Sequence, residues 1–196
     1  MTLIKSISGI RGTIGGLTKE NLTPLDVVRF TTAYAQLLKE KNKSTLTVVT
    51  GRDARISGPM IHSLVNQTLV GMGVNVINLE LSTTPTVAVA VTMEKAGGGI
   101  IITASHNPKE WNALKLLNSD GEFINFEEGR KILDFVEFEN PEYSKIDFLG
   151  KIMKKENYVD KHIESALKIE FIDIEGIKKS NFKVVVDGVN SSGGIA

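Results

Sequence analysis

The sequence predicts an α/β fold, a mainly parallel mixed sheet sandwiched by helices, followed by the start of a second similar α/β domain. Short β-branched runs alternate with amphipathic segments of helical length, as in βα units. The run Ile100-Ile101-Ile102 is apolar throughout, which is typical of a strand buried on both faces. The length of 196 residues also exceeds the roughly 150 residues of an average domain.

The first helix shows how the elements are assigned. Thr23 is a candidate N-cap, Pro24 suits the first helical position, and the following apolar side chains recur at helical spacing, which predicts a helix over 23–39. The same rules predict helices at 59–72, 84–95, 125–137 and 158–169, and strands at 45–50, 74–79, 100–103, 113–117 and 182–187.

Glycines and caps set the element ends. Residues 97–99 are all glycine and are expected to end the helix over 84–95. Asn125 followed by Glu128 has the spacing of a capping box at the start of the last helix of the first domain.

A domain boundary is predicted between residues 140 and 157, where a turn signal is followed by a charged stretch. Residues 1–155 then form the first domain and 156–196 the incomplete start of a second. We expect further domains in a longer chain. An unpaired strand at 182–187 favours self-association of the chain as it stands.

Composition excludes several classes of protein. The 23 Lys and Arg residues balance the 23 Asp and Glu residues, which disfavours a nucleic-acid or membrane-surface partner. Without cysteine there is no disulfide, thiol nucleophile or Cys-based metal site. The N-terminus lacks a secretory signal and no apolar run approaches ~20 residues, so the expected location is cytoplasmic.

Polar, turn-rich segments carry the candidate site. They lie at 8–12, 51–58, 103–108 and 112–115, and three of them follow or lie on predicted strands. The carboxyl ends of parallel strands meet at one ligand-binding edge. The cations of these segments predict an anion site, with phosphate as the commonest such anion; they are Arg11, Arg52, Arg55 and Lys115.

Motifs of other phosphate-binding, nucleophilic or metal sites match this sequence poorly. Gly188 and Gly193 have the spacing of a P-loop, but Gly194 and Ile195 replace its Lys and hydroxyl residue. No GxSxG nucleophile elbow occurs. Three histidines without cysteine disfavour a zinc site.

The string Thr103-Ala-Ser-His-Asn-Pro108 resembles the phosphoserine loop of the α-D-phosphohexomutase superfamily, which includes phosphoglucomutases, phosphomannomutases and phosphoglucosamine mutases. Supporting motifs follow in the family order: Ser8-Gly-Ile-Arg-Gly12, Gly51-Arg-Asp-x-Arg-x-Ser-Gly58, Asn112-x-x-Lys115 and Val184-Val-Val-Asp187. The resemblance covers essentially the whole chain, but only the front of the four-domain family architecture, and it implies a fold like the first domain of the family.

The resemblance implies roles for single residues. Ser105 would carry a phosphoryl group and donate it to a sugar monophosphate, forming a hexose 1,6-bisphosphate that reorients and returns its other phosphate. Lys115 matches the lysine that exchanges a proton with the sugar hydroxyl, and Arg11 the arginine that supports it. His106 matches the histidine that contacts the substrate or the phosphoserine.

The remaining implied roles concern binding. Asn107, Arg52 and Arg55 are expected to bind substrate or phosphate. Mg²⁺ would be held through phosphorylated Ser105, with its other ligands beyond residue 196, because no DGDxDR-like metal loop occurs. Ala113 also departs from the glycine that many members carry there.

The resemblance implies a phosphomutase, an intramolecular phosphotransferase of carbohydrate metabolism, expected to be inactive as this chain alone. Phosphoglucomutase/phosphomannomutase activity is the first expectation and phosphoglucosamine mutase the alternative, because the sugar-specificity loop is absent. A different class stays open, namely a non-catalytic phosphate-binding α/β module.

Overall fold

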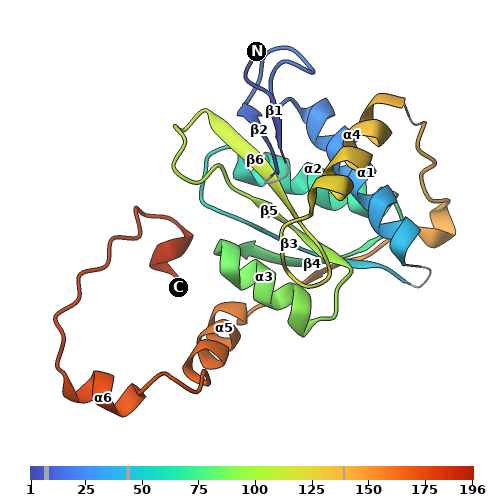
Figure 1. The fold of residues 1–196 in the computed structure, drawn as a ribbon. Coiled ribbons are helices and arrows are strands. Elements are labelled where there is room, and N and C mark those ends of the chain that lie inside the picture. Colours follow the sequence, from blue (N-terminus) through green and yellow to red (C-terminus); the bar gives the residue numbers. More distant parts are fainter. Residues whose placement is uncertain (7–8, 43–44, 139) are drawn as a thin grey trace.

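The computed structural model describes residues 1–6, 9–42, 45–138 and 140–196 (Figure 1). The described residues form a sheet with the strand order β1-β2-β6-β5-β3-β4-β7. The strands are β1 (Ile4–Ser6), β2 (Gly9–Thr13), β3 (Thr47–Arg52), β4 (Asn75–Leu81), β5 (Gly98–Ile102), β6 (Trp111–Leu117) and β7 (Ile152–Lys154). The α-helices are α1 (Pro24–Lys41), α2 (Gly58–Gly71), α3 (Thr84–Met93), α4 (Phe126–Phe138), α5 (Tyr158–Leu167) and α6 (Ile174–Lys179).

The sheet is mixed, as the sequence predicts. Strands β5, β3, β4 and β7 pair in parallel, whereas β1, β2 and β6 add antiparallel pairings on the other side of β5. The parallel character therefore holds for one half of the sheet. The hairpin of β1 and β2, which the sequence does not indicate, brings the N-terminal segment against β6.

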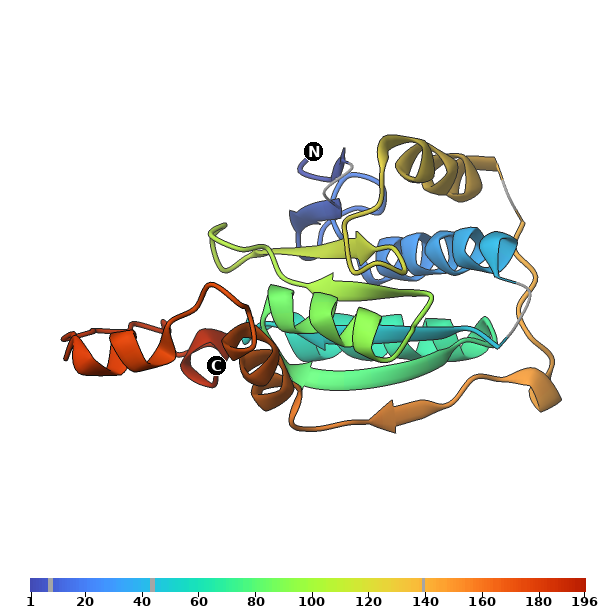
Figure 2. The ribbon, with the colours of Figure 1, turned by 60° about the horizontal axis from the view of Figure 1, so that its bottom comes forward.

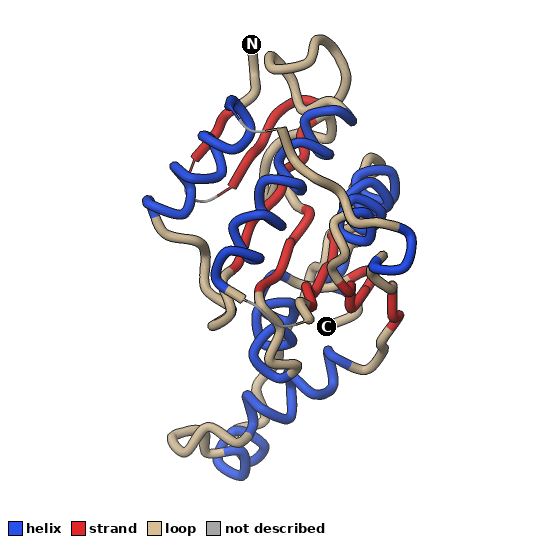
Figure 3. The backbone as a smooth tube through the Cα atoms, turned by 90° about the vertical axis from the view of Figure 1, so that its right-hand side faces the viewer, coloured by secondary structure: helices blue, strands red, loops and turns tan. Residues whose placement is uncertain are grey.

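Helices cover both faces of the sheet (Figures 2 and 3). One core lies beneath α1, α2 and α4, and a smaller one lies beneath α3 and α5. Successive strand residues alternate between them, so Ile100 and Ile102 enter the first core and Ile101 the second. The apolar run of β5 is thus buried on both faces, as predicted.

Local signals set the helix starts. The side chain of Thr23 accepts a hydrogen bond from the Asp26 N–H, and Asp26 accepts one from the Thr23 N–H, which completes a capping box. Asn125 and Glu128 make the same reciprocal pair before α4 at 3.0 and 2.8 Å. Both N-termini agree with the prediction from these residues.

The glycines at 97–99 do not end α3, because the helix already ends at Met93 with Glu94 as its C-cap, so this prediction is wrong. Gly98 and Gly99 begin β5, where the buried Tyr34 of α1 closes on the sheet. The Tyr34 hydroxyl reaches the Leu117 carbonyl at 2.6 Å, and a Cβ on Gly98 would overlap the hydroxyl oxygen. Glycine is therefore required here for close packing between helix and sheet.

The predicted boundary segment contributes β7 to the first sheet, and α5 then packs on α3. Tyr158 is buried in the smaller core, and its hydroxyl donates to Glu94. Lys155 Nζ also donates to Glu94, at 2.6 Å. Hydrogen bonds from Lys155 and Tyr158 together hold the pKa of the Glu94 carboxyl below its usual value despite partial burial.

The predicted strand at 182–187 does not form. Its side chains are largely exposed, reaching 96% for Val185, and no strand is present after Lys154 in the described part of the chain. Without a neighbouring strand, the backbone of this segment has no ladder partner. The segment follows α6 and lies apart from the sheet (Figure 1).

Among the helices of the described ranges, none is both long and apolar enough to cross a bilayer.

A buried histidine ties α2 to the sheet. The Thr50 hydroxyl donates to Asn66 Oδ1 at 2.9 Å, so its oxygen accepts the Nε2–H of His62 at 2.9 Å. Burial, together with the charge of Arg52, lowers the pKa of His62 from 6.5 to about 4, although Glu80 opposes the shift. His62 is therefore neutral in the folded protein near neutral pH.

This burial predicts a pH-dependent stability. Between pH 6.5 and about pH 4, His62 is protonated in the unfolded chain but stays neutral in the folded protein. Because the unfolded state binds more protons in this range, the free energy of unfolding falls as the pH falls. The loss between pH 7 and pH 5 from this group is about 2 kcal/mol. Urea denaturation at both pH values measures it. His62→Gln should flatten this part of the profile, and an unchanged slope in that variant would contradict the assignment.

Candidate active site

Several of the residues singled out from the sequence line one cavity of about 220 Å³ at the edge of the sheet. Arg11 comes from β2, Lys115 from β6, and Ser105, His106 and Asn107 from the loop between β5 and β6. Four catalytic candidates from three separate segments thus share one cavity. The rest of its lining is Gly9, Thr103, Ala104, Ala113 and Phe123.

The strand register places the two cations on one face. Arg11 pairs with Ala113 on the neighbouring strand, and Lys115 lies two residues further along β6. Because side chains two residues apart on a strand share a face, Arg11 and Lys115 both point to the cavity side. Ser8, which belongs to the same predicted motif as Arg11, lies outside the described residues.

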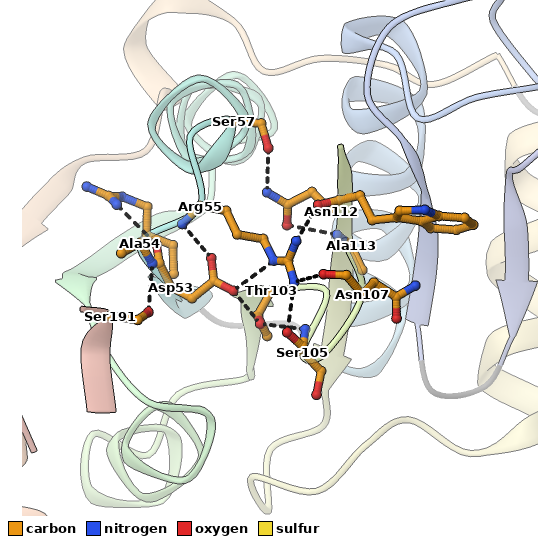
Figure 4. Close-up of polar contacts among 12 residues, drawn as sticks. Asp53, Ala54, Arg55, Ser57, Thr103, Ser105, Asn107, Asn112, Ala113 and Ser191 are labelled. Carbon is orange, nitrogen blue, oxygen red and sulfur yellow. Dashed lines mark hydrogen bonds and ion pairs between the residues drawn. The ribbon is translucent and has the colours of Figure 1, made fainter. Parts of the chain in front are cut away.

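Ser105 adopts a backbone conformation that the sequence does not indicate. Its φ is +56°, in the left-handed region that a residue with a Cβ rarely occupies. Its N–H donates to Thr103 Oγ1 at 3.0 Å, and its carbonyl accepts from Arg55 at 2.8 Å (Figure 4). The side chain is exposed at the cavity, so the hydroxyl is open to a reactant.

Arg55 lies beside the serine loop, and its guanidinium binds the backbone of that loop. Its two terminal nitrogens donate to four carbonyl oxygens of residues 105–111 at 2.6 to 3.1 Å, and its Nε lies 3.3 Å from Asp53 Oδ2 (Figure 4). These contacts engage both terminal nitrogens, and the Nε–H is buried without a hydrogen-bond acceptor. In this arrangement Arg55 binds carbonyls of the serine loop, and its role in binding phosphate stays a prediction.

Arg52 lies in another cavity, of about 550 Å³, beside Glu80 and Lys155. Its guanidinium donates to the Asp53 carbonyl at 3.1 Å and lies 3.7 Å from Glu80. The structure therefore does not bring Arg52 to Ser105. This cavity is larger, as is an apolar one of about 320 Å³ beneath α4, but neither contains a candidate nucleophile on a polar loop.

Phe123 is a cavity residue that sequence reasoning missed. Its ring is 44% exposed, and the Lys115 Nζ lies 5.9 Å from the ring centroid. Phe123 reaches the site through a bridge to Leu117 at the end of β6. No sequence signal marks this position, because the contact depends on the turn that follows β6.

The cavity does not form a metal site from carboxylates or imidazoles of this chain. Among the residues that the structure describes, no three His, Asp or Glu side chains lie together in a way that would hold a metal ion.

A family comparison agrees with the motifs. Residues 3–142 match the family model described as phosphoglucomutase/phosphomannomutase, alpha/beta/alpha domain I. The matched range contains every residue that lines the Ser105 cavity.

Relatives match over most of the chain. A phosphoglucomutase/phosphomannomutase of Thermococcus kodakarensis is 34% identical over 186 residues, covering 94% of this chain and 40% of the relative. A phosphoglucosamine/phosphogalactosamine mutase of Sulfurisphaera tokodaii is 32% identical over 186 residues, covering 93% and 39%. The chain thus spans about 40% of the length of these curated relatives.

A solved structure supports the fold. A crystal structure named as a phosphomannomutase from Thermus thermophilus aligns with a TM-score of 0.72 at 28% identity. The alignment covers 94% of this chain and 39% of that chain.

The close approach of β2 to β6 generates a stability prediction. Gly9 has a φ of +127°, and a Cβ there would overlap the Leu114 carbonyl oxygen. Gly15 also has a positive φ, +89°, but nothing lies within 4 Å of its Cβ position. Gly15→Ala should therefore cost about 1–2 kcal/mol from backbone strain alone. Gly9→Ala should cost clearly more, because β6 must also move.

Thermal or urea unfolding of both variants measures this difference. Both glycines have a positive φ, but that of Gly9 lies further from the left-handed helical region. The excess for Gly9→Ala therefore measures the added backbone strain and the steric contact with β6 together. Equal losses in the two variants would show that the contact is unimportant.

Proposed function

Because this chain belongs to the phosphoglucomutase/phosphomannomutase family, we propose that it supplies the phosphoserine part of a phosphohexomutase. The proposed reaction interconverts the 1- and 6-phosphates of a hexose through a bisphosphorylated sugar. One observation carries the proposal: the Ser105 hydroxyl is presented at a cavity that two cationic side chains from adjacent strands also line.

The proposed step uses these residues as follows. The P–Oγ bond of phosphorylated Ser105 breaks while a P–O bond to a sugar hydroxyl forms. The proton of that hydroxyl ends on Ser105 Oγ, with Lys115 as the relay. Arg11 supports the transfer by stabilising negative charge on the phosphoryl oxygens, since a phosphoserine carries a charge near −2.

The loop residues next to the serine have proposed binding roles. His106 is exposed and Asn107 half-buried, and both line the cavity, where they would contact the sugar phosphate. Arg52 could join the substrate site only through the separate cavity that it lines. Mg²⁺, when bound to the phosphorylated serine and to ligands outside this chain, would neutralise charge on the transferred group.

The hexose of the proposed reaction is either a neutral sugar or an amino sugar. Relatives named as phosphoglucomutase/phosphomannomutase and as phosphoglucosamine mutase match almost the same residues. Assays with glucose, mannose and glucosamine phosphates distinguish them. The same proposal includes further domains of a longer protein as partners of this chain. It also includes a domain boundary near residue 155.

Ser105→Ala in the longer protein should abolish both the phosphoprotein and turnover while leaving the fold intact, because an exposed hydroxyl adds little to stability. Ser63→Ala, on the exposed side of α2, is the matched control. Intact-mass spectrometry after exposure to a hexose 1,6-bisphosphate measures one added phosphate. Wild-type turnover in Ser105→Ala, or a phosphate mapped to another serine, would contradict the assignment.

Lys115→Ala should fail differently. It should retain phosphorylated Ser105 but turn over about 10²–10⁴-fold more slowly, because the proton relay is lost. Lys39→Ala on the exposed surface of α1 controls for removal of a lysine. Loss of phosphorylation in Lys115→Ala, rather than slow transfer, would assign Lys115 to another role.

This 196-residue chain alone should show negligible mutase activity, because nucleophile, metal and sugar-binding groups must be assembled together. A single-turnover assay with a hexose 1-phosphate, its 1,6-bisphosphate and Mg²⁺ measures this directly. Robust interconversion by the chain alone would show that its own residues complete the site.

A further inference from the structure

The loop after β3 contacts the serine loop through alternate residues. Asp53, Arg55 and Ser57 each bind a different part of the segment from Thr103 to Asn112 (Figure 4). We propose that these three residues form a brace that holds Ser105 in its left-handed conformation, so that Arg55 is a positioning residue rather than a ligand of phosphate. The kinetic consequence rests on the proposed function, but the effect on the loop does not.

The Arg55 guanidinium is the centre of the brace. Its Nη2 donates to the carbonyls of Ser105 at 2.8 Å and Asn107 at 2.6 Å, and its Nη1 donates to those of Pro108 at 2.7 Å and Trp111 at 3.1 Å. A planar fork of donors can satisfy diverging carbonyls of one loop at once, whereas an ammonium group cannot. One side chain therefore fixes the path of seven residues.

Asp53 links the guanidinium to the other side of Ser105. Its Oδ2 accepts the Thr103 hydroxyl at 2.6 Å and lies 3.3 Å from the Arg55 Nε. Because the Thr103 proton is donated to Asp53, the Thr103 oxygen is oriented to accept the Ser105 N–H at 3.0 Å. Both backbone polar groups of Ser105 are thus held, its N–H through Asp53 and its carbonyl by Arg55.

Ser57 anchors the far end of the segment. Its hydroxyl accepts the Asn112 Nδ2–H at 2.9 Å, and Asn112 is fully buried at the start of β6. The serine loop is therefore fixed at its start, middle and end. A residue with a Cβ at a φ of +56° persists only where its surroundings over-determine it, and the brace is what does so here.

Hydrogen exchange on the 196-residue chain tests the brace without reference to activity. Arg55→Ala should speed exchange of the peptide amides in 103–111 by at least about tenfold, because charge-assisted hydrogen bonds are lost. Exchange in β5 should stay slow. Arg29→Ala, an exposed arginine of α1, is the matched control and should leave 103–111 protected.

Two further samples separate positioning from general stability. Millimolar guanidinium should restore protection of 103–111 in Arg55→Ala, because the free ion can occupy the vacated site, and Arg55→Lys should remain unprotected. Wild-type protection in Arg55→Ala or in Arg55→Lys would overturn the proposal. So would a failure of guanidinium to restore any protection.

In the longer protein, Arg55→Ala should lower kcat by about 10²-fold with a much smaller change in KM, because the nucleophile is misplaced while substrate binding persists. A rise in KM with unchanged kcat would instead indicate a substrate ligand and overturn the positioning role. An inactive wild-type protein would refute the proposed function, while the exchange results would still decide the brace.

Discussion

Burial of the central strands on both faces is the constraint on which the rest of the molecule depends. Residues of β3, β4 and β5 alternate between two cores, so an unpaired polar group on these strands would lose its hydration without compensation. The buried polar side chains of these strands are satisfied, Thr50 by Asn66 and His62, and Asn78 by Glu80. The polar groups next to β5 that line the cavity therefore lie on the loop that follows this strand, whereas Arg11 and Lys115 come from β2 and β6.

The parallel pairing of β3 with β5 explains why two of these loops cooperate. Arg52 lies opposite Ile102, and the Asp53 N–H continues the ladder by donating to the Ile102 carbonyl at 3.1 Å. The segments that follow β3 and β5 thus leave the sheet side by side. Side chains of one loop can then reach the other, since Arg55 binds its carbonyls and Asp53 binds the Thr103 hydroxyl. These contacts hold a serine in an unfavourable conformation at an open cavity.

Features that depend on residues close together in the sequence can be predicted from it. Features that depend on contacts between distant segments cannot. The caps at Thr23 and Asn125 involve residues three apart, so they are readable directly. The serine loop is recognisable from its residue string, but its left-handed Ser105 and the use of Arg55 depend on contacts about 50 residues apart. The segment 182–187 has strand-forming residues and no neighbouring strand, and residue preference alone cannot supply one.

The pairing of β2 with β6 joins two segments that lie far apart in the sequence. Ile10 lies opposite Leu114, so this contact closes a loop of about 100 residues, whereas β3, β4 and β5 follow one another through single helices. Within the sheet the hairpin is hydrogen-bonded to the other strands through β6. During synthesis the segment that carries Arg11 is made well before β6, so the cavity can form only on a chain that has passed Lys115.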